Sequence, residues 1–398
     1  MTNRYNIFLL LAVTIPRIIV VCFFADQRVD MEWGDIVSNL ENYKIFGART
    51  VDGIVVPNIF MPPLYPIFLY CIKIFFNNIQ IYLIFIYFLQ IIFSLVSTYF
   101  IYKTLIEFYS KKTSYIGCLI FALYPLNIYS VGQISSICIQ ILFLSLFLYY
   151  VVQNLKFTSF KNILLLSFYS GLLILLRGEF FIFYFLTVLF IFLRKKNLKF
   201  IVLSILITIL TISPYLKRNF DIFGVLTVTK SGGYNLLKGN NPLAPVEGYP
   251  LRGREYNISK NLGDKIKNLR PSNQYDLIID DYYKEEAVKI IKNNPIKYLK
   301  LYFKKALSFI FIDLNSSYPN YYSLLNIIPK MIISITTLMS ICFLLFKNKD
   351  LKNTINYFTL YYFCNIGLFS VFFILPRYNL SLLPIQIILS LYLLRNLK

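Results

Sequence analysis

The sequence predicts an all-α polytopic membrane protein with about ten transmembrane helices. The 398 residues are 57% hydrophobic and have a mean hydropathy of +0.62, whereas a soluble domain averages about 45–50% apolar residues. Apolar runs of about 18–22 residues, which are long enough to cross a bilayer, recur along the chain. A soluble protein with a large core would not repeat such runs, so we expect a multi-pass membrane protein.

The topology follows from the charges between these runs. Lysine and arginine follow every second span, and such clusters are typical of cytoplasmic loops. The first run follows Arg4 and precedes no small-residue cleavage site, so we expect it to stay as an anchor with the N-terminus inside. An even number of spans then places the C-terminus inside as well. The ten predicted spans are 7–24, 79–102, 114–131, 134–153, 163–176, 180–193, 200–216, 324–346, 355–375 and 380–394.

Three parts are expected from this arrangement. Residues 1–216 form an N-terminal transmembrane module with a first outer loop at 25–78, residues 217–305 form a long basic extracytoplasmic loop, and residues 306–398 form the C-terminal helices. Long loops translocate largely regardless of their charge. Within the loops, apolar spacing predicts a helix over 275–301, and the short apolar stretches 62–76 and 307–312 are expected to lie at the membrane interface.

Composition excludes several function classes. The net charge of +21 comes largely from lysines that flank spans, so nucleic-acid binding is a poor interpretation of it. The absence of histidine removes the commonest metal ligand and neutral-pH acid–base group. The six cysteines lie mostly in apolar runs and form no CxxC pair, which is typical of small buried side chains.

The first outer loop is the acidic part of a basic chain. Between residues 26 and 66 it carries six acidic and three basic side chains, whereas almost every other hydrophilic segment is basic. Arg177 with Glu179, Arg218 and Arg377 are expected on the same side of the membrane. An acid among several bases suits a general base and an anionic substrate. Alternatively, Arg177 pairs with Glu179, and the other two arginines bind lipid headgroups.

Several segments together resemble a known family. In chain order they are DMEWGDIVSNL from Asp30, MPPLYPIF, SPYLKRNFDIFG with SGGYNLLKGNNPLA, EEAVKIIKNNPIKYLKLYFKK and RYNLSLLP. This set resembles the bacterial polyprenyl-phosphate-sugar-dependent glycosyltransferases of the GT-C fold. The likeness is to glycosyltransferase family 39, with the protein O-mannosyltransferases and the lipid A aminoarabinose transferases. Trp33 and Val37 depart from its pattern, where Tyr and Ala are usual, and no acid follows the second YP segment.

The resemblance implies an inverting glycosyltransferase in the bacterial inner membrane, with its active site on the extracytoplasmic side. A polyprenyl-phosphate sugar is the implied donor, and a glycan, lipid or protein hydroxyl is the acceptor. Asp30 is the implied catalytic carboxylate, and Arg218, Arg377 and Arg177 would bind the donor phosphate. Glu32 and Asp35 are candidates for an acceptor or cation site. No cofactor is required, although a divalent cation held by Asp30 and Glu32 stays open.

Two other functions stay open. A polysaccharide polymerase or ligase of the O-antigen kind combines similar spans with a large basic loop, but it needs no carboxylate in the first loop. A lipid-linked-sugar flippase or secondary transporter would need polar residues at mid-membrane on several spans. Here the charges lie mainly at the ends of the spans, which favours the transferase.

Overall fold

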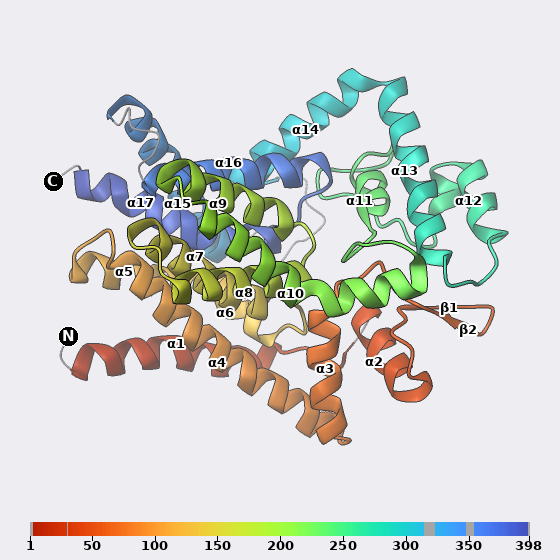
Figure 1. Ribbon diagram of the computed structural model, residues 1–398, viewed down its shortest axis with the longest axis horizontal. Coiled ribbons are helices and arrows are strands. Elements are labelled where there is room, and N and C mark those ends of the chain that lie inside the picture. Colours follow the sequence, from red (N-terminus) through yellow and green to blue (C-terminus); the bar gives the residue numbers. More distant parts are fainter. Residues whose placement is uncertain (1–2, 30, 314–322, 348–353, 397–398) are drawn as a thin grey trace.

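The computed structural model describes residues 3–29, 31–313, 323–347 and 354–396. Over these ranges the regular structure is helical apart from one two-stranded sheet, and the helices form a membrane bundle with a smaller outer module at one end (Figure 1). The bundle confirms the predicted all-α architecture.

The N-terminal part of the bundle is built from six long helices. They are α1 (Asn3–Phe24), α4 (Ile79–Leu105), α7 (Ile137–Lys156), α8 (Phe160–Leu176), α9 (Phe180–Lys195) and α10 (Leu198–Phe223). Helix α7 packs between α4 and α8, and α8 packs in turn against α10. Six of the seven apolar runs predicted as spans in this part therefore form these helices, and their packing buries most of α7.

The C-terminal part adds α15 (Leu324–Lys347), α16 (Thr354–Val371) and α17 (Leu383–Asn396). A 3₁₀ helix, Pro376–Ser381, joins α16 to α17 and carries Arg377. The predicted span at 355–375 is shorter than expected because the helix ends at Val371. The extended segment after it leaves Arg377 at the end of the bundle.

Five helices are long and apolar enough to cross a membrane by length and composition, namely α1, α4, α7, α10 and α15. A sixth candidate is a broken one, formed by α5 (Lys111–Leu123) with α6 (Pro125–Tyr129) and its extension to Gly132, and it bends by 57°. The span predicted at 114–131 coincides with this broken pair, and its crossing of the membrane stays a prediction. Tyr124 is extended (ψ 123°), as the residue before a proline prefers. The total of ten spans stays a prediction.

The first outer loop is mostly structured. Helix α2 (Met31–Tyr43) leads to the hairpin β1 (Arg49–Val51) and β2 (Ile54–Val56), and α3 (Leu64–Phe75) follows. Asp52 and Gly53 both have positive φ, as a tight two-residue hairpin turn requires. A helix is thus confirmed within the predicted stretch 62–76, while its interfacial position stays a prediction.

The long loop folds into α11 (Gly232–Gly239), α12 (Lys260–Lys267), α13 (Tyr275–Asn293) and α14 (Pro295–Ile310). The expected single helix at 275–301 was wrong, since the chain breaks at Asn294, whose side chain caps the next helix through Lys297 N (3.3 Å). Pro295 then occupies the first turn of α14, where its missing N–H is not needed. The stretch 307–312, predicted as a separate interfacial piece, largely belongs to α14.

The two outer segments share one apolar core. Val56 of β2 is buried with Leu237 of α11, Leu251, and Tyr283 of α13. The first loop is therefore fixed against the long loop, and together they form the outer module seen at the right of Figure 1.

One buried arginine lies within the bundle. Arg17 of α1 is fully buried, and it donates to Ser94 Oγ of α4 (2.6 Å), to Ala122 O of α5 (3.0 Å) and to Val13 O (2.8 Å). Its guanidinium joins three helices without a carboxylate. A charged group at this depth is costly unless it is partnered in this way.

Candidate active site

Three neighbouring cavities lie where the bundle meets the outer module. The first, of about 390 Å³, is lined by Asp26, Trp33 and Arg377 among others. The second, of about 190 Å³, shares Trp33 and Arg377 with it and adds Arg177. The third, of about 270 Å³, shares Arg177 and Tyr378 with the second. Because each cavity shares wall residues with the next, they are neighbours, and we call the three together the outer cavity.

Arg177 is placed in the outer cavity by the end of α8. It pairs with Glu179 (Nε–Oε1 2.6 Å), donates to Gln140 Oε1 (3.3 Å), and lies over the ring of Tyr378 at 4.7 Å. The predicted alternative, an Arg177–Glu179 ion pair, is confirmed. The pair does not remove Arg177 from the cavity, so an anion could still approach the remaining face of its guanidinium.

Arg377 differs from Arg177 in being unpaired. Within the described ranges its contact is with the ring of Tyr378 (5.9 Å), and it has neither an ion pair nor a hydrogen bond there. It lines both of the cavities that contain Trp33. An exposed guanidinium without an acid partner, on the wall of a cavity, is suited to an anionic ligand.

Lys238 of α11 is a further basic residue that the sequence analysis did not select. It lies over the ring of Phe373 at 4.4 Å, and the described residues offer it no ion pair. Burial lowers its pKa, the nearby Arg377 lowers it further, and Glu32 opposes both. The three side chains therefore interact electrostatically. Its position in the segment SGGYNLLKGNNP was the available signal.

The carboxylates of the first loop are distributed around this space. Asp26 lines the first of the three cavities, and its Oδ2 accepts from Ile134 N at 2.8 Å. Glu32 is half-buried and lies within electrostatic range of Lys238, whereas Asp35 is exposed. Partial burial raises the pKa of Asp35, Arg252 opposes that rise, and Glu32 adds to it. Asp30 lies outside the described residues.

Arg218 lies apart from Arg177 and Arg377 and lines none of the three cavities. Its guanidinium donates to Asn58 O (2.7 Å), Asn219 Oδ1 (2.7 Å) and Phe46 O (3.4 Å). It fastens α10 to the first outer loop by these bonds. Its role at the donor phosphate stays a prediction. The contacts that it makes in the structure stabilise the packing of α10 against the first outer loop.

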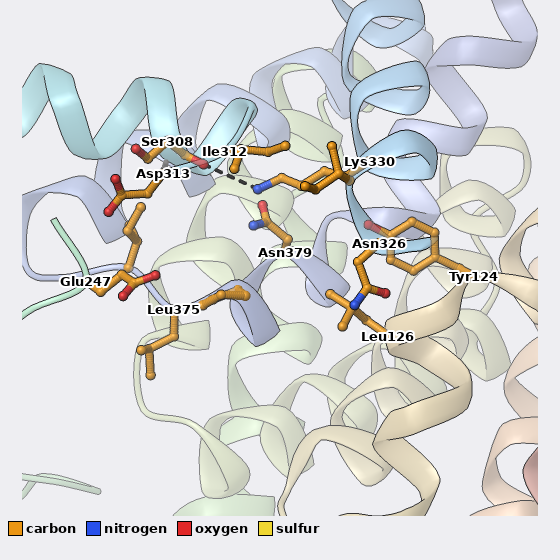
Figure 2. Close-up of a pocket in the computed structure, with 13 residues that line it drawn as sticks. Tyr124, Leu126, Glu247, Ser308, Ile312, Asp313, Asn326, Lys330, Leu375 and Asn379 are labelled. Carbon is orange, nitrogen blue, oxygen red and sulfur yellow. Dashed lines mark hydrogen bonds between the residues drawn. The ribbon is translucent and has the colours of Figure 1, made fainter. Parts of the chain in front are cut away.

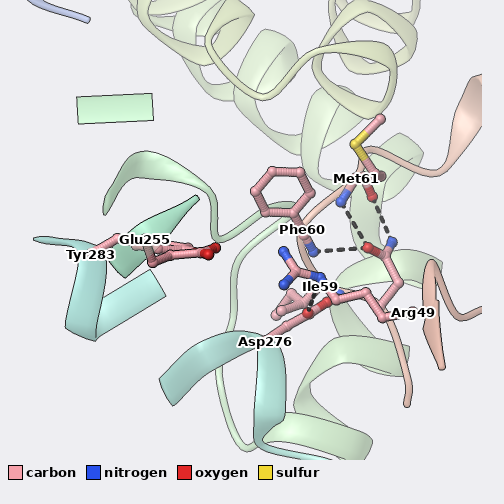
Figure 3. Close-up of polar contacts among 8 residues, drawn as sticks. Arg49, Ile59, Phe60, Met61, Glu255, Asp276 and Tyr283 are labelled. Carbon is pink, nitrogen blue, oxygen red and sulfur yellow. Dashed lines mark hydrogen bonds and ion pairs between the residues drawn. The ribbon is translucent and has the colours of Figure 1, made fainter. Parts of the chain in front are cut away.

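Buried polar contacts hold the first loop in register with α13 (Figure 3). Arg49 pairs with Asp276 (Nε–Oδ1 3.2 Å), whose Oδ2 accepts from Ile59 N at 3.3 Å. The buried Asn58 accepts from the backbone N–H groups of Phe60 (3.0 Å) and Met61 (2.9 Å). Phe60 and Met61 line the second cavity. These bonds therefore set the wall of the outer cavity.

A separate pocket of about 40 Å³ lies between α14, α15 and the 3₁₀ helix (Figure 2). Lys330 donates there to Ser308 O (3.3 Å), and Glu247 and Asp313 lie on the other side of the pocket. A water molecule in the liquid takes up about 30 Å³. The pocket is therefore too small for a sugar, and the larger outer cavity is the better candidate.

Metal ligation gains no support from the geometry. Across the part of the chain that the structure describes, no three His, Cys, Asp or Glu side chains converge as a metal site would require. Asp30 is outside this part, so a cation shared by Asp30 and Glu32 is untested.

Comparison with known protein families gives a match over part of the chain. Residues 45–217 match the model of the family described as dolichyl-phosphate-mannose-protein mannosyltransferase. No curated protein matches the chain. The match covers β1 to the last turns of α10 and includes Arg177, whereas Glu32, Lys238 and Arg377 lie outside it. Together with the helical bundle, it supports an integral membrane glycosyltransferase with a GT-C-like fold.

Proposed function

We propose that the protein is an inverting transferase that moves a sugar from a polyprenyl-phosphate donor to an acceptor hydroxyl. The observation that carries this proposal is Arg377, which has no ion pair among the described residues and lines the same two cavities as Trp33 of α2. Arg177 lines the second cavity with Arg377, and a phosphate between them would receive charge-assisted hydrogen bonds. Lys238 lines none of the three cavities, but it adds positive charge within electrostatic range of Arg377. The first loop supplies Asp26, which lines the same cavity as Arg377.

The proposed reaction needs one base and one anion site. A first-loop carboxylate takes the proton of the acceptor hydroxyl, and the acceptor oxygen forms a bond to the anomeric carbon from the face opposite the phosphate. The bond between that carbon and the phosphate oxygen breaks, and polyprenyl phosphate leaves with the electron pair. Arg377 and Lys238 stabilise the charge that develops on it. No metal is required in this scheme.

Asp30 is the proposed base because of its place at the head of DMEWGDIVSNL. Asp26, which lines the same cavity as Arg377, is its nearest competitor, and Glu32 is the next. The proposed setting is the bacterial inner membrane, with the outer module and cavity on the extracytoplasmic side. The acceptor is a glycan, lipid or protein hydroxyl, and nucleic acid has no part.

The test is sugar transfer in membranes that carry each variant at equal expression. General-base assistance is typically worth about 10²–10⁴-fold, so Asp30→Asn should lose that much turnover, with donor binding retained. If turnover is lost in Asp26→Asn or Glu32→Gln but is normal in Asp30→Asn, the catalytic base is the residue whose variant lost turnover. Normal turnover in all three would refute a first-loop base and favour a polymerase or ligase.

A further inference from the structure

Helix α14 presents an apolar stripe that no described part of the protein covers. Ile296, Leu299, Phe303 and Leu307 are 66%, 57%, 57% and 58% exposed. With an advance of about 100° per residue, they occupy an arc of about 80°. Four large apolar side chains on one arc of a helix mark a surface that is normally covered.

The lysines of α14 lie on one flank of this stripe. Lys297, Lys300 and Lys304 are exposed, and they fall about 60–120° from the centre of the stripe, all in the same direction. The opposite flank carries the uncharged Tyr302 and Ala306. The helix therefore has an apolar side, a basic side and a side that packs on the protein.

The packed side fixes the rotation of the helix. Lys305 is fully buried, and its Nζ donates to Asn240 Oδ1 of α11 (3.0 Å) and to Phe372 O after α16 (2.6 Å). Phe309 stacks on Phe369 of α16 with ring centroids 5.9 Å apart. These contacts lie on the opposite side of α14 from Phe303. They prevent the helix from turning its stripe inward.

The end of α14 is joined to a membrane-spanning candidate. Ser334 Oγ of α15 donates to Ile310 O at 2.5 Å, and α15 has its own exposed apolar residues, including Ile328 and Ile332. Figure 1 shows α14 running from the end of α13 toward α15 and α16. The exposed stripe therefore leads toward the lipid-facing surface of the bundle.

We propose that α14 lies in the membrane interface, with its apolar stripe in the acyl-chain boundary and its lysine flank on anionic phospholipid headgroups. An apolar face beside a row of basic residues is the pattern of an interfacial helix. Each lysine close to an anionic surface adds about fivefold to the association. The buried side of the same helix contacts α11, so bound lipid would steady the helix that carries Lys238.

Amide hydrogen exchange of the full chain in lipid nanodiscs tests this proposal without measuring sugar transfer. Peptides covering 295–310 should exchange at least about fivefold more slowly in phosphatidylcholine mixed with phosphatidylglycerol than in phosphatidylcholine alone. Gln at Lys297, Lys300 and Lys304 together should abolish this difference. In the control variant, Gln replaces the exposed Lys260, Lys267 and Lys289, which removes the same amount of charge from α12 and α13. This variant should keep the difference in exchange between the two lipid compositions. Equal exchange in both lipids, or the same loss in both triple variants, would overturn the proposal.

A second measurement tests the orientation. In a chain whose native cysteines are replaced, a bimane probe at Leu299→Cys should be quenched by brominated acyl chains much more than one at Lys297→Cys. Equal quenching at both positions would overturn the proposed rotation. Absence of quenching at Leu299, with cross-links between copies, would assign the stripe to a second copy instead and refute the lipid proposal.

Discussion

The Arg49–Asp276 pair tests whether the first outer loop is held in place by the long loop. Its side chains are 13% and 2% exposed, and Nε lies 3.2 Å from Oδ1. At an effective dielectric of about 20, that distance gives an attraction of about 5 kcal/mol. Removing one member of a buried pair costs about 3–5 kcal/mol, because the other charge stays buried without compensation. Arg49→Ala should therefore loosen the hairpin by about 3 kcal/mol.

Hydrogen exchange of peptides covering the hairpin measures this effect. A loss of about 3 kcal/mol corresponds to an opening constant that is about 10²-fold larger. Lys217→Ala is the matched control, since Lys217 forms an exposed ion pair with Asp221, 77% and 55% exposed, and such pairs contribute little. Unchanged exchange in Arg49→Ala, or equal changes in both variants, would refute the reasoning.

The destabilisation caused by Arg49→Ala should also depend on pH, in a direction that the structure predicts. Burial raises the pKa of Asp276, and Arg49 and the N–H groups of Ile59 and Phe60 oppose that rise. Without Arg49 the pKa should rise further, so the folded loop would bind a proton more tightly than the unfolded chain, whose aspartate pKa is about 3.9. Stability is then greatest below the unfolded pKa and falls as the pH rises through the folded pKa. The defect of Arg49→Ala should therefore be smaller in acid than at neutral pH, and a defect that grew in acid would contradict this.

Three further predictions concern the site and the topology. Gly239→Ala should abolish transfer and lower the melting temperature, because its Cβ would come within 1.6 Å of Phe372 O, whereas Gly232→Ala meets nothing within 4 Å and should be silent in thermal unfolding. Arg377→Ala should weaken apparent donor affinity about 10-fold or more, and Arg377→Lys should rescue it only partly because lysine lacks the bidentate fork; normal affinity in the alanine variant would make Arg377 a headgroup ligand. An impermeant thiol reagent should label Lys260→Cys in intact cells, and labelling only after permeabilisation would place the outer cavity on the cytoplasmic side.

The helices could be predicted from the sequence because their apolar runs are long. The starts of α4 and α15 agree with the predicted starts at Ile79 and Leu324. Local breaks were harder. The Asn294–Pro295 and Tyr124–Pro125 steps both carried a proline signal, but apolar periodicity continued through them and suggested uninterrupted helices.

The candidate site was less predictable because the spacing of residues along the sequence does not specify which side chains will interact in the fold. Arg177, Arg218 and Arg377 all lie at the ends of apolar runs and looked alike in the sequence. In the structure the first is paired in the cavity, the second is bonded to carbonyl groups of the first loop, and the third has no ion pair among the described residues. Lys238 was not selected, since its contact with the ring of Phe373 and its electrostatic interaction with Glu32 join segments that are far apart in the sequence.

The buried Arg17 has a consequence for how the chain is assembled. Its partners on α4 and α5, Ser94 and Ala122, are 77 and 105 residues further along. During synthesis the first helix therefore enters the membrane before either partner exists, and its guanidinium must stay hydrated or reach the headgroups until then. Stable lateral release of α1 into lipid should wait for α4 and α5, so the first helix joins the bundle late although it is made first.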